Sequence, residues 1–559
     1  MDRINSPRGG ASRRRVLALG AAALASPAIV ARAEPPGLLI AGGPIHTGVA
    51  GAKPVEALAI KGERILYAGS LGEARRVVPG AAAIDLAGAT AFPGFVDSHV
   101  HLVGVGMREL TLNLEGSASI AEVQSRLRAW ARQRPTGPII GNGWIETHWP
   151  EHRFPTRQDL DAVVADRPVY LGRSDGHAGV ANSSALALAG VTASTANPAG
   201  GEILRDAKGE PTGMLVDNAQ RLMTTRLPQP DKAVQREALT RADRLYRSRG
   251  WTAAHHMSVD QDALDVLLAM AASGDLGLRV DNYMVPAAAT FVLAEGPSTD
   301  ATGKVRVRGV KLFADGALGS RGAALLAPYS DKPESTGLLV TPHEVMVQAM
   351  AKARASGAQV AVHAIGDRGN RLTLDAMTEV LGAGHTDRRW RIEHAQIISP
   401  QDLPRFAAMG VIASMQPSHA IGDLYFAPAR LGDERLKGAY AWRSLLASGA
   451  VVCTGTDAPV EKGDPLIEFY AAVYRHALNG FAGPDWGLDQ TVSRAQALHM
   501  ITAAPAYAVG REAELGTLEA GKRADVTVFS KNLMTASPPD ILKAKAMLTM
   551  TAGRIVYAA

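Results

Sequence analysis

The chain contains a single cysteine, Cys453, among its 559 residues. An intramolecular disulfide is therefore impossible, and the sequence indicates either folding under reducing conditions or a fold large enough to need no disulfide. Long apolar runs are also scarce. Beyond the first 33 residues, no segment reaches the ~18 uninterrupted apolar residues that a membrane span requires, so we expect no stable membrane span in the mature chain.

Most of the chain also has almost no net charge. The formal net charge is +5, but residues 1–33 carry six arginines against one aspartate and so account for all of it. The remaining residues sum to about zero. This balance gives no indication of a nucleic-acid partner or of an anionic membrane surface.

The first 33 residues have the three parts of an export signal. Arg13-Arg14-Arg15 form a basic region after Ser12, Val16–Val30 is an apolar stretch of small residues, and Ala31-Arg32-Ala33 is an A-x-A cleavage site. The order resembles the twin-arginine pattern. We expect export through the twin-arginine machinery, cleavage near Ala33, and a periplasmic or secreted protein. A membrane anchor is the alternative.

The length of the chain predicts at least two domains, because one compact core rarely serves so many residues. Residues 34–92 hold short strand-like runs separated by glycine and proline, and residues 508–559 repeat this texture. Two β segments at opposite ends of the chain predict one small composite domain.

The middle of the chain, residues 93–507, alternates strands with helices. Strand candidates include Val305–Phe313, Ala358–Val362, Trp390–Glu393, Val411–Met415 and Val451–Thr454, with amphipathic helical stretches such as His343–Ser356 between them. Repeated strand-then-helix units predict a parallel sheet, open or closed. A less regular region rich in glycine, proline and tryptophan predicts an insertion around residues 135–245.

The segment Phe92–His101 contains the pair His99 and His101. Side chains two residues apart on a strand point to the same face, so both imidazoles lie together with Asp97. Two imidazoles at the end of a strand are natural ligands for a divalent metal. A pair of hydrogen-bonded core histidines is the alternative, and this motif alone does not decide between them.

Three further residues each follow an apolar run: His363, His394 and Asp457. In a barrel of β/α units the C-terminal ends of the strands collect the catalytic groups. One such residue is usually structural, but three in successive units after the first pair favour a metal site.

Lys311 lies inside the strand-like run Gly309–Phe313. An edge-strand lysine facing water is the alternative to a buried one. Burial of the amine would lower its pKa. The neutral amine could then react with carbon dioxide to form a carbamate, an anionic ligand able to bridge two cations.

Taken together, these motifs resemble the amidohydrolase superfamily, and within it the YtcJ-like and N-substituted formamide deformylase-like branch (amidohydrolase family 3). The blocks that carry the resemblance are Pro93–His101, Asp175–Ser183, Lys311–Arg321, His363–Asp367, Arg391–Gln396, Gln416–His419, Arg430–Arg435, Thr456–Val460 and Gly516–Asp525. The resemblance implies a distorted (β/α)8 TIM barrel with a small β-sandwich domain built from both chain ends.

The resemblance also implies a role for each ligand. His99 and His101 would hold one divalent metal, His363 and His394 a second, and Lys311 would bridge them as its carbamate. Asp457 would contact the nucleophilic water and shuttle its proton. Two zinc ions are expected, with manganese or iron as alternatives.

The expected reaction is hydrolysis of a non-peptide C–N bond in a small linear amide or N-formyl or N-acyl amine. His177 would stabilise the oxyanion or form only a loop hydrogen bond. Arg430, Arg435 and Trp144 would contact substrate, or be ion-paired and packed residues. A heterocycle deaminase on the same scaffold is one alternative, although no acid follows His363 in the H-x-E spacing; a non-catalytic metal-binding barrel is another.

Overall fold

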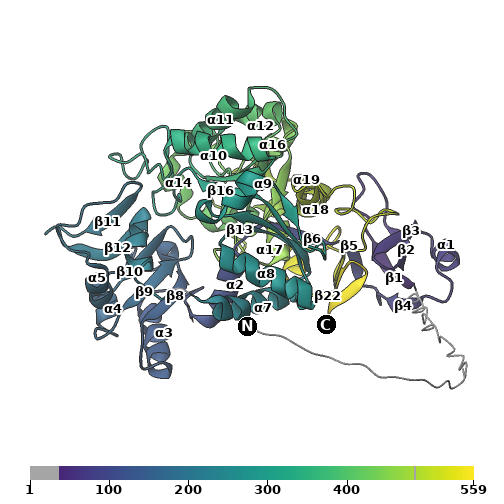
Figure 1. The fold of residues 1–559 in the computed structure, drawn as a ribbon, viewed down its shortest axis with the longest axis horizontal. Helices are drawn as coiled ribbons and strands as arrows, with labels where there is room; N and C mark the ends of the chain where they lie inside the picture. Colours follow the sequence, from purple (N-terminus) through teal and green to yellow (C-terminus); the bar gives the residue numbers. More distant parts are fainter. Residues whose placement is uncertain (1–36, 229, 484–485) are drawn as a thin grey trace, which may run out of the picture. The chain divides into compact units, whose positions relative to one another are not determined.

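The computed structural model describes residues 37–228, 230–483 and 486–559 (Figure 1). The predicted export signal in residues 1–33 lies outside the described residues. Within the described ranges, no helix is both long and apolar enough to cross a membrane.

Eight parallel strands form the central sheet of the molecule. In spatial order they are β20 (Val452–Thr454), β19 (Ile412–Met415), β18 (Arg391–His394), β17 (Gln359–Ala364), β16 (Val305–Phe313), β14 (Arg279–Met284), β13 (Trp251–Val259) and β6 (Phe95–Val100). The segment after β20 bonds back to β6, because the Asp457 amide donates to the His99 carbonyl at 2.7 Å. The strands therefore make a nearly closed barrel, which confirms the predicted β/α barrel.

The helices around the barrel begin and end where local chemistry dictates. Helix α7 (Lys232–Arg249) begins after Asp231, whose carboxylate accepts from the Val234 amide, and ends at Gly250 in the left-handed conformation. Helix α8 (Gln261–Ser273) repeats this arrangement, with an aspartate at its start and a glycine at its end. Such short connections produce the strand–helix alternation seen around the barrel (Figure 1).

Both ends of the described chain build one further sheet. Its strands are β1 (Leu38–Ile45), β2 (Val55–Lys61), β3 (Arg64–Gly69), β4 (Ala82–Asp85), β5 (Thr90–Pro93), β21 (Val526–Phe529), β22 (Ala546–Thr551) and β23 (Arg554–Ala558), in the order β23-β22-β21-β5-β1-β2-β3 with β4 beside β1. Ile40 and Ile60 from the N-terminal half share a hydrophobic core with Val526 and Met550 from the C-terminal half. This arrangement is consistent with the predicted composite β-sandwich domain.

The insertion forms a sheet of its own. Its strands are β7 (Leu112–Asn113), β8 (Ile139–Trp144), β9 (Val169–Arg173), β10 (Ala178–Ala181), β11 (Gly201–Arg205) and β12 (Pro211–Asp217). The sheet thus begins before residue 135. Helix α7, placed inside the insertion by the predicted boundary of 245, packs instead on α2 (Leu102–Leu110) of the barrel. Gly106 makes this possible, since a Cβ there would lie 1.9 Å from the Ala238 carbonyl oxygen.

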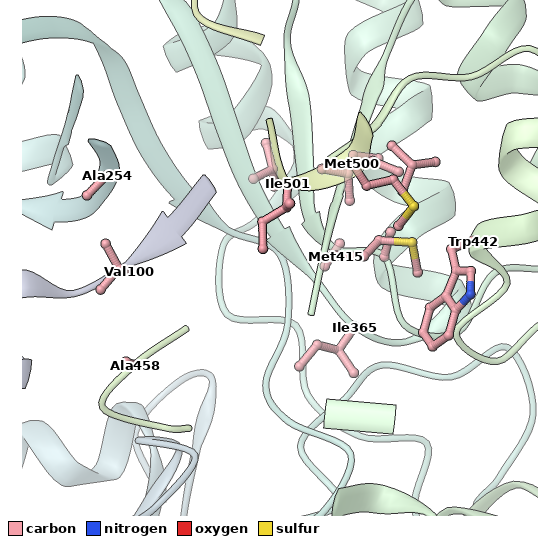
Figure 2. Close-up of a cluster of buried hydrophobic side chains, with 14 of the residues drawn as sticks. Val100, Ala254, Ile365, Met415, Trp442, Ala458, Met500 and Ile501 are labelled. Atoms are coloured by element: carbon pink, nitrogen blue, oxygen red, sulfur yellow. The ribbon is translucent and has the colours of Figure 1, made fainter. Parts of the chain in front are cut away.

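The barrel core extends into the segments that follow its strands. Figure 2 shows buried side chains from the strands (Val100, Ala254, Met415), from the segments after β17 and β20 (Ile365, Ala458) and from helix α18, Arg494–Ile501 (Met500, Ile501). Tightly packed interiors hold side chains in defined positions. The segments that carry the polar site are therefore anchored by the same core as the strands.

Candidate metal centre and active site

The predicted ligand residues converge at the C-terminal ends of the barrel strands. His99 lies in β6, Lys311 in β16 and His363 in β17, and His394 ends β18, while His101 and Asp457 follow β6 and β20. Asp457 Oδ1 lies 3.3 Å from His99 Nε2 and 3.2 Å from His101 Nε2. The Lys311 amine lies 3.4 Å from His99 Nε2.

His363 and His394 complete the cluster. Their ring centroids lie 4.6 Å apart, and the His394 ring lies 4.8 Å from that of His99. One potential ligand atom each from His99, His394 and Asp457 fall within 4.8 Å of one another. This spacing suits side chains that share a divalent cation.

The protonation states of these groups fit a cation. Burial holds the pKa of His363 and of His394 well below the usual value, so both imidazoles are neutral and keep a lone pair for a metal. Burial alone would raise the pKa of Asp457, but the neighbouring His99 and His101 hold it well below the usual value. The site therefore offers the neutral imidazoles of His363 and His394 together with the Asp457 carboxylate.

Asp457 Oδ1 is buried and makes no hydrogen bond to any described residue. The two imidazole nitrogens approach it closely but without hydrogen-bond geometry, as expected for atoms that converge on a cation rather than bond one another. A buried, unpartnered carboxylate oxygen is costly unless a cation or donor satisfies it. The residues present thus fit a metal.

A second set of side chains orients the ligands. His99 Nδ1 lies 2.6 Å from Glu393 Oε2, and His394 Nδ1 lies 2.8 Å from Gln416 Oε1. Occupation of Nδ1 leaves Nε2 free to face the centre, which is how metal-binding histidines are commonly held. Sequence reasoning assigned no role to Glu393 or Gln416, although both lie in the motifs that carried the resemblance.

Glu393 and His394 are neighbours in β18, yet both contact His99. Regular strand alternation would send them to opposite faces. The backbone of His394 has φ of +73°, and that of Ala395 has φ of +44°, so the alternation stops at this point. The left-handed conformation turns His394 toward the same centre that Glu393 supports.

Asp97 holds neighbouring segments in place and is not itself positioned as a metal ligand. Its carboxylate accepts from the Tyr246 hydroxyl at 3.0 Å and from the Thr456 hydroxyl at 2.6 Å, and also from the Thr456 amide at 2.9 Å. These bonds tie the segment that carries Asp457 to β6. They leave Asp97 as an orienting residue.

Lys311 lies inside the barrel, with 1% of its surface exposed. Burial lowers the pKa of its amine to about 8. The alternative of an edge-strand lysine in contact with water is therefore wrong. A larger fraction of neutral amine is available near neutral pH than for an exposed lysine.

His177 reaches the centre from the insertion sheet. Its Nδ1 lies 2.7 Å from Asp217 Oδ1, and its ring lies 4.8 Å from that of His363. Burial lowers the pKa of His177, but the carboxylates of Asp217 and Asp175 outweigh this, so the net pKa is raised. His177 makes the expected loop hydrogen bond and also faces the site.

A cavity opens over this centre. His177, His363, His394 and Asp457 line it together with apolar groups such as Leu318 and Phe426 and with acids at its edge. Among these acids, burial raises the pKa of Asp423 to about 7 and that of Glu461 to about 8. The cavity combines an apolar wall with polar groups at one end, as small-molecule sites commonly do.

Three predicted substrate contacts lie away from this cavity. Arg430 pairs with Asp331. Arg435 donates to the Ala327 carbonyl at 2.9 Å. Trp144 is fully buried and donates to the Leu171 carbonyl at 2.8 Å. These placements match the alternative interpretations of ion pairing and packing.

A parallel β/α barrel with histidines, a lysine and an aspartate at its C-terminal strand ends defines the class of metal-dependent hydrolases. A family model described as "Amidohydrolase family" matches residues 82–557. The chain therefore belongs to the amidohydrolase family.

Individual relatives place it more closely. The chain is 34% identical over 485 residues to YtcJ of Bacillus subtilis (strain 168), covering 85% of this chain and 90% of YtcJ. It is 28% identical over 528 residues to the N-substituted formamide deformylase of Arthrobacter pascens, covering 90% and 95%. An uncharacterized metal-dependent hydrolase of Pyrococcus horikoshii OT3 has a similar structure, with TM-score 0.74 and 30% identity over 90% of this chain and 99% of that one. These similarities support the YtcJ-like branch.

Proposed function

We propose that the protein hydrolyses a non-peptide C–N bond in a linear amide or an N-formyl or N-acyl amine. The observation that carries the proposal is the buried Asp457 carboxylate that lines the cavity, with Oδ1 beside His99 and His101. The relative named as an N-substituted formamide deformylase, aligned over 90% of this chain, supports the same bond class.

The residues imply where metal would bind. His99 and His101 would hold one divalent ion, His363 and His394 a second, and Lys311 as its carbamate would lie between them; zinc is the expected ion, with manganese or iron as alternatives. When bound, such ions lower the pKa of a water molecule toward neutrality and withdraw electron density from a carbonyl group.

The protein's own groups perform the proton transfers. Asp457 accepts a proton from the attacking water and gives it to the leaving nitrogen, since it lines the cavity beside His394, with Oδ2 3.9 Å from His394 Nδ1. His177, held by Asp217, donates a hydrogen bond to the substrate. The apolar side chains of Leu318 and Phe426 exclude water around the amide.

A substrate screen tests this proposal. We expect the purified enzyme, loaded with zinc, to hydrolyse N-formyl or N-acyl amines, with amine release measured by chromatography. A chelator should abolish the activity and added metal should restore it. The matched variant Asp457→Asn should lower kcat by at least about a hundredfold, in the range of lost acid–base catalysis. Hydrolysis that survives complete metal removal would contradict the proposal.

Lys311 provides a separate test of the bridging carbamate. Enzyme equilibrated with 13C-labelled bicarbonate should show a carbamate carbon signal in NMR spectra. The Lys311→Ala variant should lack that signal and bind less metal, because an anionic ligand is gone. Full metal content in the folded variant would remove Lys311 from the ligand set while leaving the amide reaction itself testable.

A further inference from the structure

His419 is a buried histidine of the cavity to which neither the sequence motifs nor the proposed mechanism assigns a role. It lies on helix α13 (Pro417–Asp423), directly after barrel strand β19, and 7% of its surface is exposed. It lines the cavity beside His394 and Asp457. Its Nε2 atom is buried and makes no hydrogen bond to any residue that the structure describes.

The neighbouring amide defines which nitrogen of His419 carries the proton. Gln396 Nε2 donates to His419 Nδ1 at 2.9 Å, while Gln396 Oε1 accepts from the Tyr440 hydroxyl at 3.5 Å. With the Gln396 amide in this orientation Nδ1 accepts a hydrogen bond, which assigns the proton of the neutral ring to Nε2. His419 thus presents an N–H donor to the cavity.

No acceptor on the described part of the chain takes up this donor. The nearest carboxylate oxygen, Asp457 Oδ2, lies 3.7 Å from Nε2, beyond hydrogen-bond distance. A buried donor without an acceptor costs about 1–3 kcal/mol. Because the cavity has the features of a small-molecule site, we expect the bound ligand to supply the acceptor for the His419 Nε2–H.

Ring contacts place His419 relative to the other donor. The rings of His177, His363, His394 and His419 form a chain of neighbours, with successive centroids 4.8, 4.6 and 5.9 Å apart. His177 and His419 therefore stand at the two ends of the pair expected to hold one metal. A carbonyl group positioned over His363 and His394 would lie between them.

We propose that the His419 Nε2–H donates a hydrogen bond to the acyl oxygen of the scissile amide, with Gln396 as the residue that positions it. The assignment rests on the proposed amide hydrolysis. In an amide the nitrogen lone pair is delocalised, so the carbonyl oxygen is the only good acceptor next to the reacting carbon. The bond strengthens as negative charge develops on that oxygen, so its main effect is on kcat.

Substitution of His419, combined with a change of acceptor atom in the substrate, tests this assignment. The probes are N-benzylformamide and N-benzylthioformamide, because a thiocarbonyl sulfur is a much weaker hydrogen-bond acceptor than oxygen. We expect His419→Phe to lower kcat on the formamide by about a hundredfold, the usual loss for one such donor. KM should change little. On the thioformamide the same variant should lose less than about tenfold.

Conservative variants separate a donor from a packing residue. His419→Gln places an amide N–H near the position of Nε2 and should recover most of the lost kcat. Gln396→Leu removes the partner of Nδ1 and should give an intermediate loss, again smaller on the thioformamide. The matched control is His343→Phe on helix α10 (His343–Ser356), since His343 pairs with Glu379 on the outside of the barrel.

The outcomes distinguish this inference from the function on which it rests. Equal losses on the two substrates, an unchanged kcat in His419→Phe, or a fall in metal content that accounts for the loss would each overturn the role of His419. Turnover by the wild-type enzyme would meanwhile leave amide hydrolysis intact. A wild-type enzyme that hydrolyses no amide would overturn both.

Discussion

At the scale of single residues, the ligands could be predicted from the sequence but their supports could not. His99, His363 and His394 each lie at the end of a strand candidate, so the strand–helix pattern predicts that they meet at one end of a barrel. The contact between His99 Nδ1 and Glu393 joins residues 294 positions apart. Such a contact has no local pattern, because it arises only when distant strands lie side by side.

Glu393 is expected to control metal affinity through His99. In the Glu393→Gln variant the charge that holds the His99 Nδ1–H is lost, and metal affinity should fall about 10- to 100-fold, as for other partners of metal-binding histidines. Arg391, which is fully buried and bonds to Glu393, would lose its anion at a cost of about 3 kcal/mol. Metal titration and chemical denaturation measure the two effects.

The control for this variant is Glu434→Gln, which removes an exposed carboxylate paired with Lys437. It should leave both metal affinity and stability unchanged. If Glu393→Gln bound metal as tightly as the wild type, His99 would need no carboxylate to orient it.

At the scale of elements, the sequence predicted an insertion but not the contacts that join the insertion to the barrel. Strand β12 ends at Asp217, whose φ of +48° is rare for a residue other than glycine. The Asp217 carboxylate fits against Gly316 and Gly322 of the segment after β16. Sequence periodicity cannot predict this contact. The Asp217 carboxylate fits there only because Gly316 and Gly322, about a hundred residues later in the chain, have no side chains.

A methyl group at Gly322 should therefore disturb His177. In Gly322→Ala the new Cβ would lie 2.4 Å from Asp217 Oδ2, which must move away from His177. We expect about 1–3 kcal/mol of destabilisation from the overpacking, and a fall in kcat/KM larger than the stability change explains. Steady-state kinetics with the substrate found in the screen measure it, with thermal unfolding in parallel.

The control is Gly384→Ala, where a Cβ would meet no atom within 4 Å. It should match the wild type in both measurements. Wild-type kcat/KM in a folded Gly322→Ala enzyme would mean that the His177–Asp217 contact does not assist the reaction.

At the scale of the whole molecule, the strand–helix alternation of the barrel was the most predictable property. Strand Val305–Phe313 and helix His343–Ser356 have the predicted bounds. Both elements bury one face in the same large core, so the apolar periodicity of their sequences matches the structure that they form. The burial of individual carboxylates, in contrast, could not be predicted from the apolar pattern. Glu468 of helix α17 (Pro465–Tyr474) is 1% exposed and accepts from the Ser418 amide at 3.1 Å, which the sequence of the helix does not predict.

Glu468 should make stability depend on pH. Burial holds its pKa well above the usual value in the folded state. The unfolded chain loses this proton first, so the free energy of unfolding should fall as pH rises above about 4.3, by up to about 1.4 kcal/mol per pH unit until the folded-state pKa is reached. Glu468→Gln keeps an acceptor for Ser418 and removes this dependence. Denaturation curves between pH 5 and pH 8 should show the variant gaining stability over the wild type as pH rises.

The exposed Glu237→Gln, whose carboxylate pairs with Arg241 on the surface of α7, provides the comparison and should show a constant difference from wild type over this range. A constant difference for Glu468→Gln as well would mean that Glu468 ionises in the folded protein at its ordinary pKa.

The sheet built from both chain ends has a consequence for biosynthesis. Strand β5 pairs with β21, and Pro93 lies opposite Val526, so about 430 residues separate the two partners. At synthesis rates of about 5–20 residues per second, β5 waits roughly 20–90 seconds on the ribosome before its neighbour exists. The N-terminal strands therefore cannot complete their sheet until synthesis has passed β21, which ends at Phe529. A chain cut before Val526 would lack β21 and would leave this edge of β5 exposed.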